Sequence, residues 1–270
     1  MSTNTISHRF LLGLSILLLA FSACRPDDTE VIRLNPTTFD AEDEAVIGRR
    51  LTNESWRNEN VTRITPDNGE FTDGAYFYLR PLLAGILEQP FVTRRDSFEW
   101  QIHLVLDQAP HAYTLPGGQI ILHTGLLHQL ENEAECIGIL AREVALAESG
   151  APMQALDRQV EDNVTLGDLI LGNIVPLDHI IEALPQIKYS EAELGVADSI
   201  AALLVCQSDY EERGLTLSVK RFSEGSPYAA ARPANRHWIT TFDSRISECP
   251  GADSLYQQRY MDVLEGFVPR

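Results

Sequence analysis

The chain has 270 residues, with 21 Lys and Arg against 39 Asp and Glu, and carries a formal net charge of −18. So acidic a chain is repelled by nucleic-acid phosphates and by anionic lipid headgroups, which argues against both as electrostatic partners. Hydrophobic residues make up 44% of the sequence, enough for a sizeable core in one large domain or two small ones.

Residues 1–23 have the features of an export signal. His8 and Arg9 precede an apolar run over 10–20, which is shorter than the ~20 residues a membrane-spanning helix needs. The run ends in FSAC (21–24), which resembles the lipobox of bacterial lipoproteins, with phenylalanine where leucine is usual. We therefore expect a lipid on Cys24, which anchors an exported protein in the bacterial envelope, at the outer membrane. Plain secretion is the alternative.

The next segment, residues 24–40, is predicted to be an acidic tether. It contains two prolines and no sustained periodicity, which is typical of a linker, although an ordered N-terminal arm is the alternative. From Ala41 the pattern becomes helical, with Asp40 as a capping residue. We assign residues 41–270 to a single domain.

Two further elements precede the middle of the chain. The pattern predicts a helix over 71–87 and a strand over 100–107. The triplet Pro116-Gly117-Gly118 then forces a turn, because proline fixes φ and glycine accepts positive φ. The β-branched run 119–123 that follows is predicted to be a strand.

A long helix should follow this strand. Asn132, with Glu135 three residues later, is a capping pair, and Gly150 supplies the end of the helix. Apolar residues recur at i, i+3 and i+7, which predicts one buried stripe; they are Ile137, Leu140 and Val144.

The remaining segments carry weaker signals. Residues 164–184 are apolar but interrupted by charges, and are expected to form a helix pair divided near Pro176 and no membrane span. His103 and His123 are expected on strands, in structural roles. Cys136 should be a small buried hydrophobe, whereas the sequence leaves open whether Cys206 and Cys249 pair.

The segment 111–146 resembles the HtpX-type and CaaX-prenyl-protease-type zinc metalloendopeptidases, metallopeptidase family forty-eight. The pieces TLPGG (114–118), HTGLL (123–127) and LENE (130–133) occur in the family's order and at its spacing. A second stretch, YSEAELGVAD (189–198), matches the family's later motif at its first two and last two residues. The resemblance implies an α+β, zincin-like fold, mainly helical, with a small sheet packed beside the central helix.

The residues that hold zinc in that family are replaced here. The HExxH motif falls on Arg142 to Leu146, so both histidines are gone, and the third ligand, a glutamate, falls on Leu194. A guanidinium is permanently protonated and leucine has no lone pair, so neither ligates zinc. Glu143 stays as the remnant general base, without a metal-bound water to act on. We therefore expect no metal and no cofactor, and the resemblance implies a pseudopeptidase.

The replacements also predict a local geometry. If the family alignment holds, Arg142, Leu146 and Leu194 lie close together. The two leucines can then fill the space of the metal, and Arg142 needs a carboxylate partner. Asp198, a motif residue on the facing helix, is the expected one.

Three functions follow from the sequence. The first is binding of extended polypeptide, or of an envelope partner, through the strand before the central helix, which the resemblance makes an exposed edge; its residues are Gly118, Gln119, Ile120, Ile121 and Leu122. The second is an active zinc peptidase with unconventional ligands, although no HxxxH pair occurs in the chain. The third is an envelope scaffold with a filled cleft.

Overall fold

The computed structural model describes residues 39–58, 60–65, 70–159, 166–173, 176–222, 249 and 254–268. The chain divides after residue 32 into two units, and all of these residues belong to the second, Arg33–Arg270. The expected export signal, the lipidation site Cys24 and most of the expected tether lie outside the described residues. Within the described ranges, no helix is long and apolar enough to cross a membrane.

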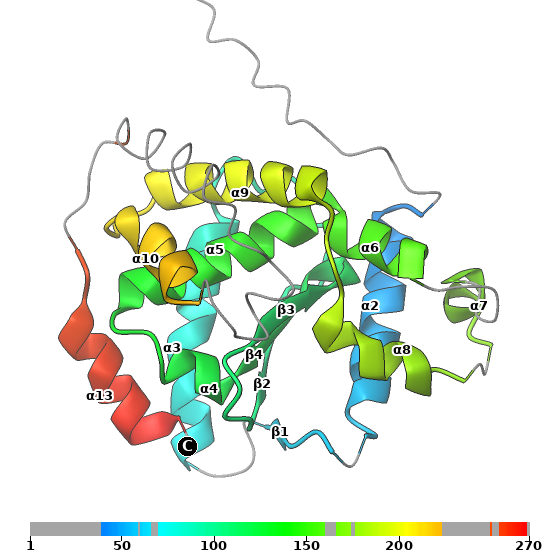
Figure 1. Cartoon of the computed structure of the whole chain (residues 1–270), viewed down its shortest axis with the longest axis horizontal. Coiled ribbons are helices and arrows are strands. Elements are labelled where there is room, and N and C mark those ends of the chain that lie inside the picture. Colours follow the sequence, from blue (N-terminus) through cyan, green and yellow to red (C-terminus); the bar gives the residue numbers. More distant parts are fainter. Residues whose placement is uncertain are drawn as a thin grey trace, which may run out of the picture. The chain divides into compact units, whose positions relative to one another are not determined.

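The described part is mainly helical and contains a small four-stranded sheet (Figure 1), as predicted for the α+β, zincin-like fold. Its elements, in chain order, are α2 (Ala41–Ser55), β1 (Arg63–Ile64), α3 (Glu70–Leu87), β2 (Gln101–Val105), β3 (Ala112–Leu115), β4 (Gln119–His123), α4 (Thr124–Leu127), α5 (Glu133–Ser149), α6 (Ala151–Gln159), α7 (Leu166–Ile170), α8 (Asp178–Ala183), α9 (Glu191–Cys206), α10 (Arg213–Arg221) and α13 (Gln257–Phe267).

The sheet has the strand order β1-β2-β4-β3. Strand β2 pairs with β4 in parallel, and β3 pairs with β4 antiparallel, with Ala112 opposite Leu122. The reversal between β3 and β4 is the 3-10 turn Pro116–Gly118, where Gly117 and Gly118 have φ of 71° and 79°. A side chain is strained at such angles, so the glycines fix the place of the turn.

Local signals set the ends of the central helix α5. The Asn132 side chain accepts the N–H of Glu135 at 2.9 Å, and Gly150, at φ 77°, ends the helix in the left-handed region. In the expected reciprocal bond the Glu135 carboxylate would accept the N–H of Asn132. Instead, Glu135 Oε2 accepts the N–H of Glu131 at 3.2 Å. Asp40 caps α2 with a full capping box, as predicted for that helix.

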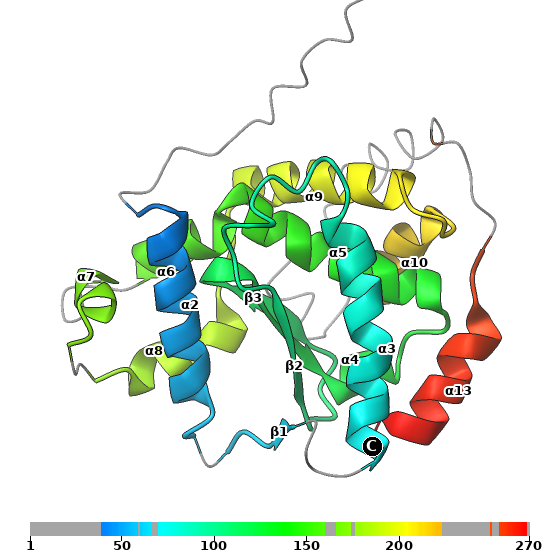
Figure 2. The ribbon, with the colours of Figure 1, turned by 180° about the vertical axis from the view of Figure 1, so that it is seen from behind.

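Helix α5 is buried on every side, so the prediction of a single buried stripe was wrong in extent. It packs against α9, α10, α3 and β3, and Figures 1 and 2 show α9 alongside it from both sides. Its polar residues are buried because distant segments supply partners. These include Arg259 for Glu133, Arg221 for Glu135 and the Arg94 backbone N–H for Glu148.

The later elements agree with the sequence patterns. The pair α7 and α8 lies on either side of Pro176, as predicted. Cys206, at the end of α9, forms a disulfide with Cys249, which answers the question that the sequence left open. Cys136 is a free, buried cysteine, as expected, and burial raises the pKa of its thiol to about 12.

Candidate functional site

The site begins with an ion pair between the two helices that carry the family motifs. Arg142 of α5 donates from Nε to Oδ1 of Asp198 on α9 at 2.7 Å, and its Nη2 lies 3.4 Å from Oδ2. The side chains are only 2% and 3% exposed. This two-point contact is the geometry in which a guanidinium fits a carboxylate best. The predicted partnership of Arg142 with Asp198 is therefore confirmed.

The two leucines of the degenerate ligand set are buried in the same helix interface. Helices α5 and α9 run in opposite directions, as Figure 1 shows, and Arg158 near the end of α6 pairs with Glu193 at the start of α9. Leu146 lies one turn after Arg142 on α5, and Leu194 lies one turn before Asp198 on α9. Because the helices are antiparallel, both leucines lie on the same side of the ion pair. Leu146 is fully buried and Leu194 is 6% exposed. Their direct packing stays a prediction.

Glu143, the remnant general base, is held by the sheet. The Oγ1 of Thr114 on β3 donates to Glu143 Oε2 at 2.8 Å and lies 3.2 Å from its backbone oxygen. Both residues are buried, with Glu143 at 0% exposure. The Glu143 side chain is therefore shielded from bulk solvent.

Glu193, next to the ligand position 194, has a structural role instead. Ser190 and Glu193 form a capping box at the start of α9, in which Glu193 Oε2 accepts the N–H of Ser190 at 2.7 Å. Its carboxylate also pairs with Arg158, whose Nη2 lies 2.7 Å from Oε2. The S-x-x-E spacing of a capping box was present in the sequence and would have identified this role.

The strand predicted to bind polypeptide is not an edge. Strand β4 lies between β2 and β3, and all five of its residues are buried. Gly118, the first residue of the predicted strand, lies in the buried turn before it. The prediction failed because the Pro116–Gly118 turn folds β3 back along the outer side of β4. Among the described strands, β3 is the one at that border of the sheet.

A cavity of about 640 Å³ lies at the N-terminal end of β3, where β2 and β4 end. Its polar wall contains His123 of β4, whose Nδ1 lies 3.2 Å from Oδ2 of Asp107, and His111, whose ring contacts the carbonyl of Pro185. Tyr113 stacks at 5.3 Å from the ring of His111. Burial lowers the pKa of His123, so this imidazole is neutral at pH 7. The sequence showed no spacing that would have brought these residues together.

The structure also tests whether zinc fits the residues that stand at the family's ligand positions. A zinc centre needs nitrogen, oxygen or sulfur donors that converge on one point. Here the three positions carry a guanidinium, already bound to Asp198, and two alkyl side chains. Within the described residues no group of three or more His, Cys, Asp or Glu is arranged to hold a metal ion. The residues present do not fit the metal.

Comparison with known proteins agrees with the motifs. The model of Peptidase family M48 matches residues 88–232, more than half of the chain. The mitochondrial metalloendopeptidase OMA1 of Schizosaccharomyces pombe is 25% identical over 170 residues, which are 58% of this chain and 50% of that protein. The chain thus spans about half the length of this curated relative. With the family segment covering β2 to α10 and both degenerate motifs, the chain belongs to Peptidase family M48.

Proposed function

We propose that this chain is a pseudopeptidase, an M48 domain that binds a polypeptide or an envelope partner without cleaving it. The observation that carries the proposal is the buried pair of Arg142 with Asp198 at the position of a metal ligand. M48 catalysis needs a metal-bound water beside the motif glutamate. In this chain a cation that cannot exchange for zinc occupies that place, and the glutamate is sealed against Thr114.

The decisive experiment measures metal and activity on one sample. Full-length protein, purified after exposure to excess zinc, is expected to contain far less than one zinc per chain by elemental analysis. It should not cleave an unfolded, fluorescently labelled casein. Near-equimolar zinc together with chelator-sensitive cleavage would overturn the proposal and favour an active peptidase with unconventional ligands.

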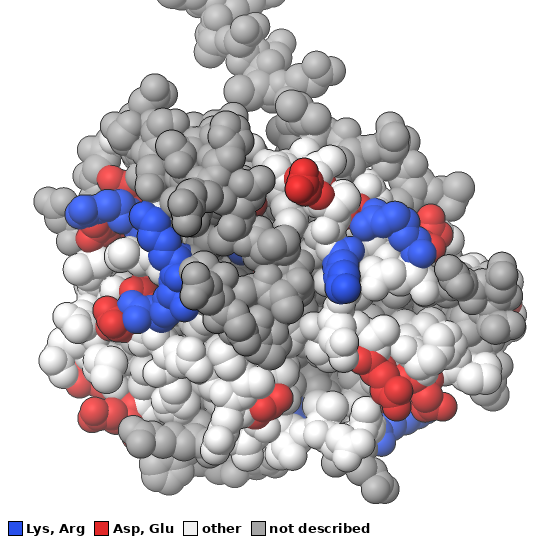
Figure 3. Space-filling view, in the orientation of Figure 1, with Lys and Arg blue, Asp and Glu red and all other residues white. Residues whose placement is uncertain are grey.

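The cavity beside β3 supports the binding role. It lies at the border strand of the sheet, is walled by Tyr113, His111 and His123, and has the size of a site that accepts a side chain or a small molecule. On the face in Figure 3, Lys and Arg side chains lie next to Asp and Glu side chains. Such a mixed surface favours a partner held by shape and apolar contact, and not a nucleic acid.

A binding assay tests this role separately from the metal analysis. Anisotropy of labelled, reduced and unfolded α-lactalbumin should rise with added protein, and Tyr113→Ala should weaken the binding. The matched control is Leu171→Ala, at an exposed residue that lies outside this cavity. Equal binding by both variants would show that the polypeptide does not bind at this cavity. That result would favour the scaffold role with a filled cleft.

We also propose that Cys24 carries a lipid that anchors the protein in the bacterial envelope, at the outer membrane. The support is the apolar run over 10–20 that ends in FSAC. The wild-type protein should fractionate with membranes and Cys24→Ser should not. Mass spectrometry that finds the mature N-terminus at another residue, without an acyl group, would contradict the proposal.

A further inference from the structure

Helix α3 presents an uncovered apolar face on the side away from the sheet. Phe77 is 82% exposed, and Pro81 and Gly85 follow it at four-residue spacing and are exposed too. Residues four apart share one face of a helix, so these form a continuous stripe. An uncovered stripe of this kind on a folded protein commonly marks a binding surface.

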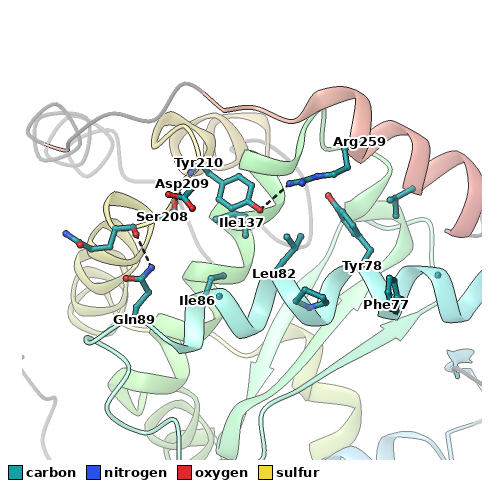
Figure 4. A pocket seen from close by; sticks show the side chains of 15 residues that line it. Phe77, Tyr78, Leu82, Ile86, Gln89, Ile137, Ser208, Asp209, Tyr210 and Arg259 are labelled. Atoms are coloured by element: carbon teal, nitrogen blue, oxygen red, sulfur yellow. Dashed lines mark hydrogen bonds between the residues drawn. The ribbon is translucent and has the colours of Figure 1, made fainter.

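This stripe forms one wall of a cavity of about 810 Å³, shown in Figure 4. The segment 207–210 after α9 and the helix α13 supply the other walls, and Ile137 of α5 contributes as well. The lining is dominated by carbon, with Leu82, Ile86 and Val263 among its members. A volume of this size and a largely apolar lining are typical of sites that enclose one small molecule.

The charges on the walls restrict the ligand. Arg259 donates from Nε to Glu133 Oε2 at 2.7 Å, so that carboxylate balances its charge, and its Nη2 lies 3.4 Å from the Tyr210 hydroxyl. Asp209 is exposed and forms no ion pair with any residue in the described ranges. Figure 4 shows Asp209 beside Tyr210, across the cavity from Leu82 and Ile86. The surplus charge of the cavity is therefore negative.

The aromatic rings act in the same direction. Phe77, Tyr78 and Tyr210 line the cavity, and the faces of such rings attract cations. Burial raises the pKa of Tyr210 to about 12, so its phenol is neutral at physiological pH. At this end of the cavity a fatty-acid carboxylate would face the carboxylate of Asp209, whereas an ammonium group finds that carboxylate and the ring of Tyr210 beside it.

We propose that this cavity binds an apolar organic cation, namely a single-chain amine or quaternary ammonium compound. Its alkyl chain lies along α3 and its cationic end lies at Asp209 and Tyr210. The site is separate from the M48 motifs and does not depend on the proposed function.

Gly85 offers a selective way to fill the cavity. A Cβ added at Gly85 meets no atom within 4 Å, so a leucine there enters the cavity and not the core. Gly195 on α9 is the matched control, because its Cβ also meets nothing within 4 Å and it does not line the cavity. Both changes improve helix propensity, so loss of fold does not confuse the result.

The test uses isothermal titration of the full chain with decyltrimethylammonium, with decanoate and with an amphipathic helical peptide of Leu and Lys. The cation should bind with 1:1 stoichiometry and at least about fivefold more tightly than decanoate. Gly85→Leu should weaken it at least about tenfold, by occupying the volume. Gly195→Leu should leave it unchanged, and Asp209→Asn should remove the preference over decanoate.

Three results would overturn the proposal. One is decanoate binding as tightly as the cation. Another is unchanged binding by Gly85→Leu. The third is binding of the peptide alone, sensitive to Gly85→Leu, which would make this face a docking site for a protein helix instead.

Discussion

Arg142 and Asp198 meet in a two-point contact, with Nε 2.7 Å from Oδ1, in an interface that leaves them 2% and 3% exposed. They come from the two helices that supply the metal ligands in the family that this chain resembles. A buried charge that loses its partner keeps its desolvation cost, so the pair is more sensitive to loss of one member than to loss of both.

The first prediction concerns that asymmetry. Arg142→Met and Asp198→Leu should each lower the free energy of unfolding by about 3–5 kcal/mol, and the double variant should lose less than either single one. Urea unfolding of the four proteins measures the coupling. Arg57→Ala is the control and should cost no more than about 1 kcal/mol, because Arg57 pairs with Glu54 at the surface. Additive losses in the double variant would show that the pair is not coupled.

The second prediction rebuilds the metal site. Arg142→His with Leu146→His should destabilise the domain, since Asp198 loses its cation, and should not bring zinc binding, since position 194 still lacks a donor. Adding Leu194→Glu completes a ligand set of two histidines and one glutamate and should give about one zinc per chain. Elemental analysis and thermal unfolding with and without chelator measure both effects. Equal zinc content in the double and triple variants would show that 194 does not face 142 and 146.

The third prediction concerns the close crossing of α5 and α10. A Cβ on Gly138 would lie 2.6 Å from Leu215 Cα, so Gly138→Ala should destabilise the protein by about 1–3 kcal/mol despite its better helix propensity. Gly195→Ala, with open space at its Cβ, should stabilise by about 0.5–1 kcal/mol. Denaturant midpoints of the two variants should move in opposite directions. A stabilising shift in both variants would mean that helix propensity, and not the contact with α10, decides.

The fourth prediction is a pH dependence. Burial lowers the pKa of His103 and of His123, so each binds a proton more readily in the unfolded chain. Stability from this source is complete above the unfolded pKa, near 6.5, and is lost as pH falls from there toward the lower folded pKa. Each histidine contributes a slope of at most about 1.4 kcal/mol per pH unit in that window.

Unfolding measured at several pH values between 5 and 8 checks this dependence. His123→Gln should flatten the part of the decline that belongs to His123. Leu171→Ala, at an exposed residue whose side chain does not titrate, is the control and should leave the decline as it is. A decline that is unchanged in the His123 variant would assign it to other groups.

The fifth prediction concerns the disulfide of Cys206 with Cys249, which are 43 residues apart. Closing a loop of that length restricts the unfolded chain, so Cys249→Ser should lower stability by about 4 kcal/mol.

Native protein should not react with iodoacetamide at Cys136, since that thiol is buried and its pKa is raised to about 12. Peptide mapping after alkylation, with and without urea, separates the two cysteine classes. Rapid native modification of Cys136 would mean that α5 opens readily.

The sequence predicted those features that local chemistry decides. The cap at Asn132 and the end at Gly150 depend on residues within one turn, and the structure confirms both. The pair of Arg142 with Asp198 could be foreseen because the family resemblance gave the facing helix.

Two features could not be predicted from the sequence, because they depend on residues that are distant along the chain. The full burial of α5 rests on Arg221 and Arg259, which lie 86 and 126 residues from the carboxylates that they bind. The interior place of β4 rests on its parallel pairing with β2, and strand order is not encoded in the pattern of one strand. The cluster of His111, His123 and Asp107 likewise arises from strand pairing.

The contact of Arg142 with Asp198 has a consequence for where the protein can work. A zinc-linked helix pair loses its link when the surroundings hold little metal or much chelator. A guanidinium and a carboxylate are supplied by the chain itself at synthesis, and no competing ligand can remove them. The junction of α5 and α9 is thus independent of metal supply, and the fold should be equally stable in a metal-starved compartment and in a metal-rich one.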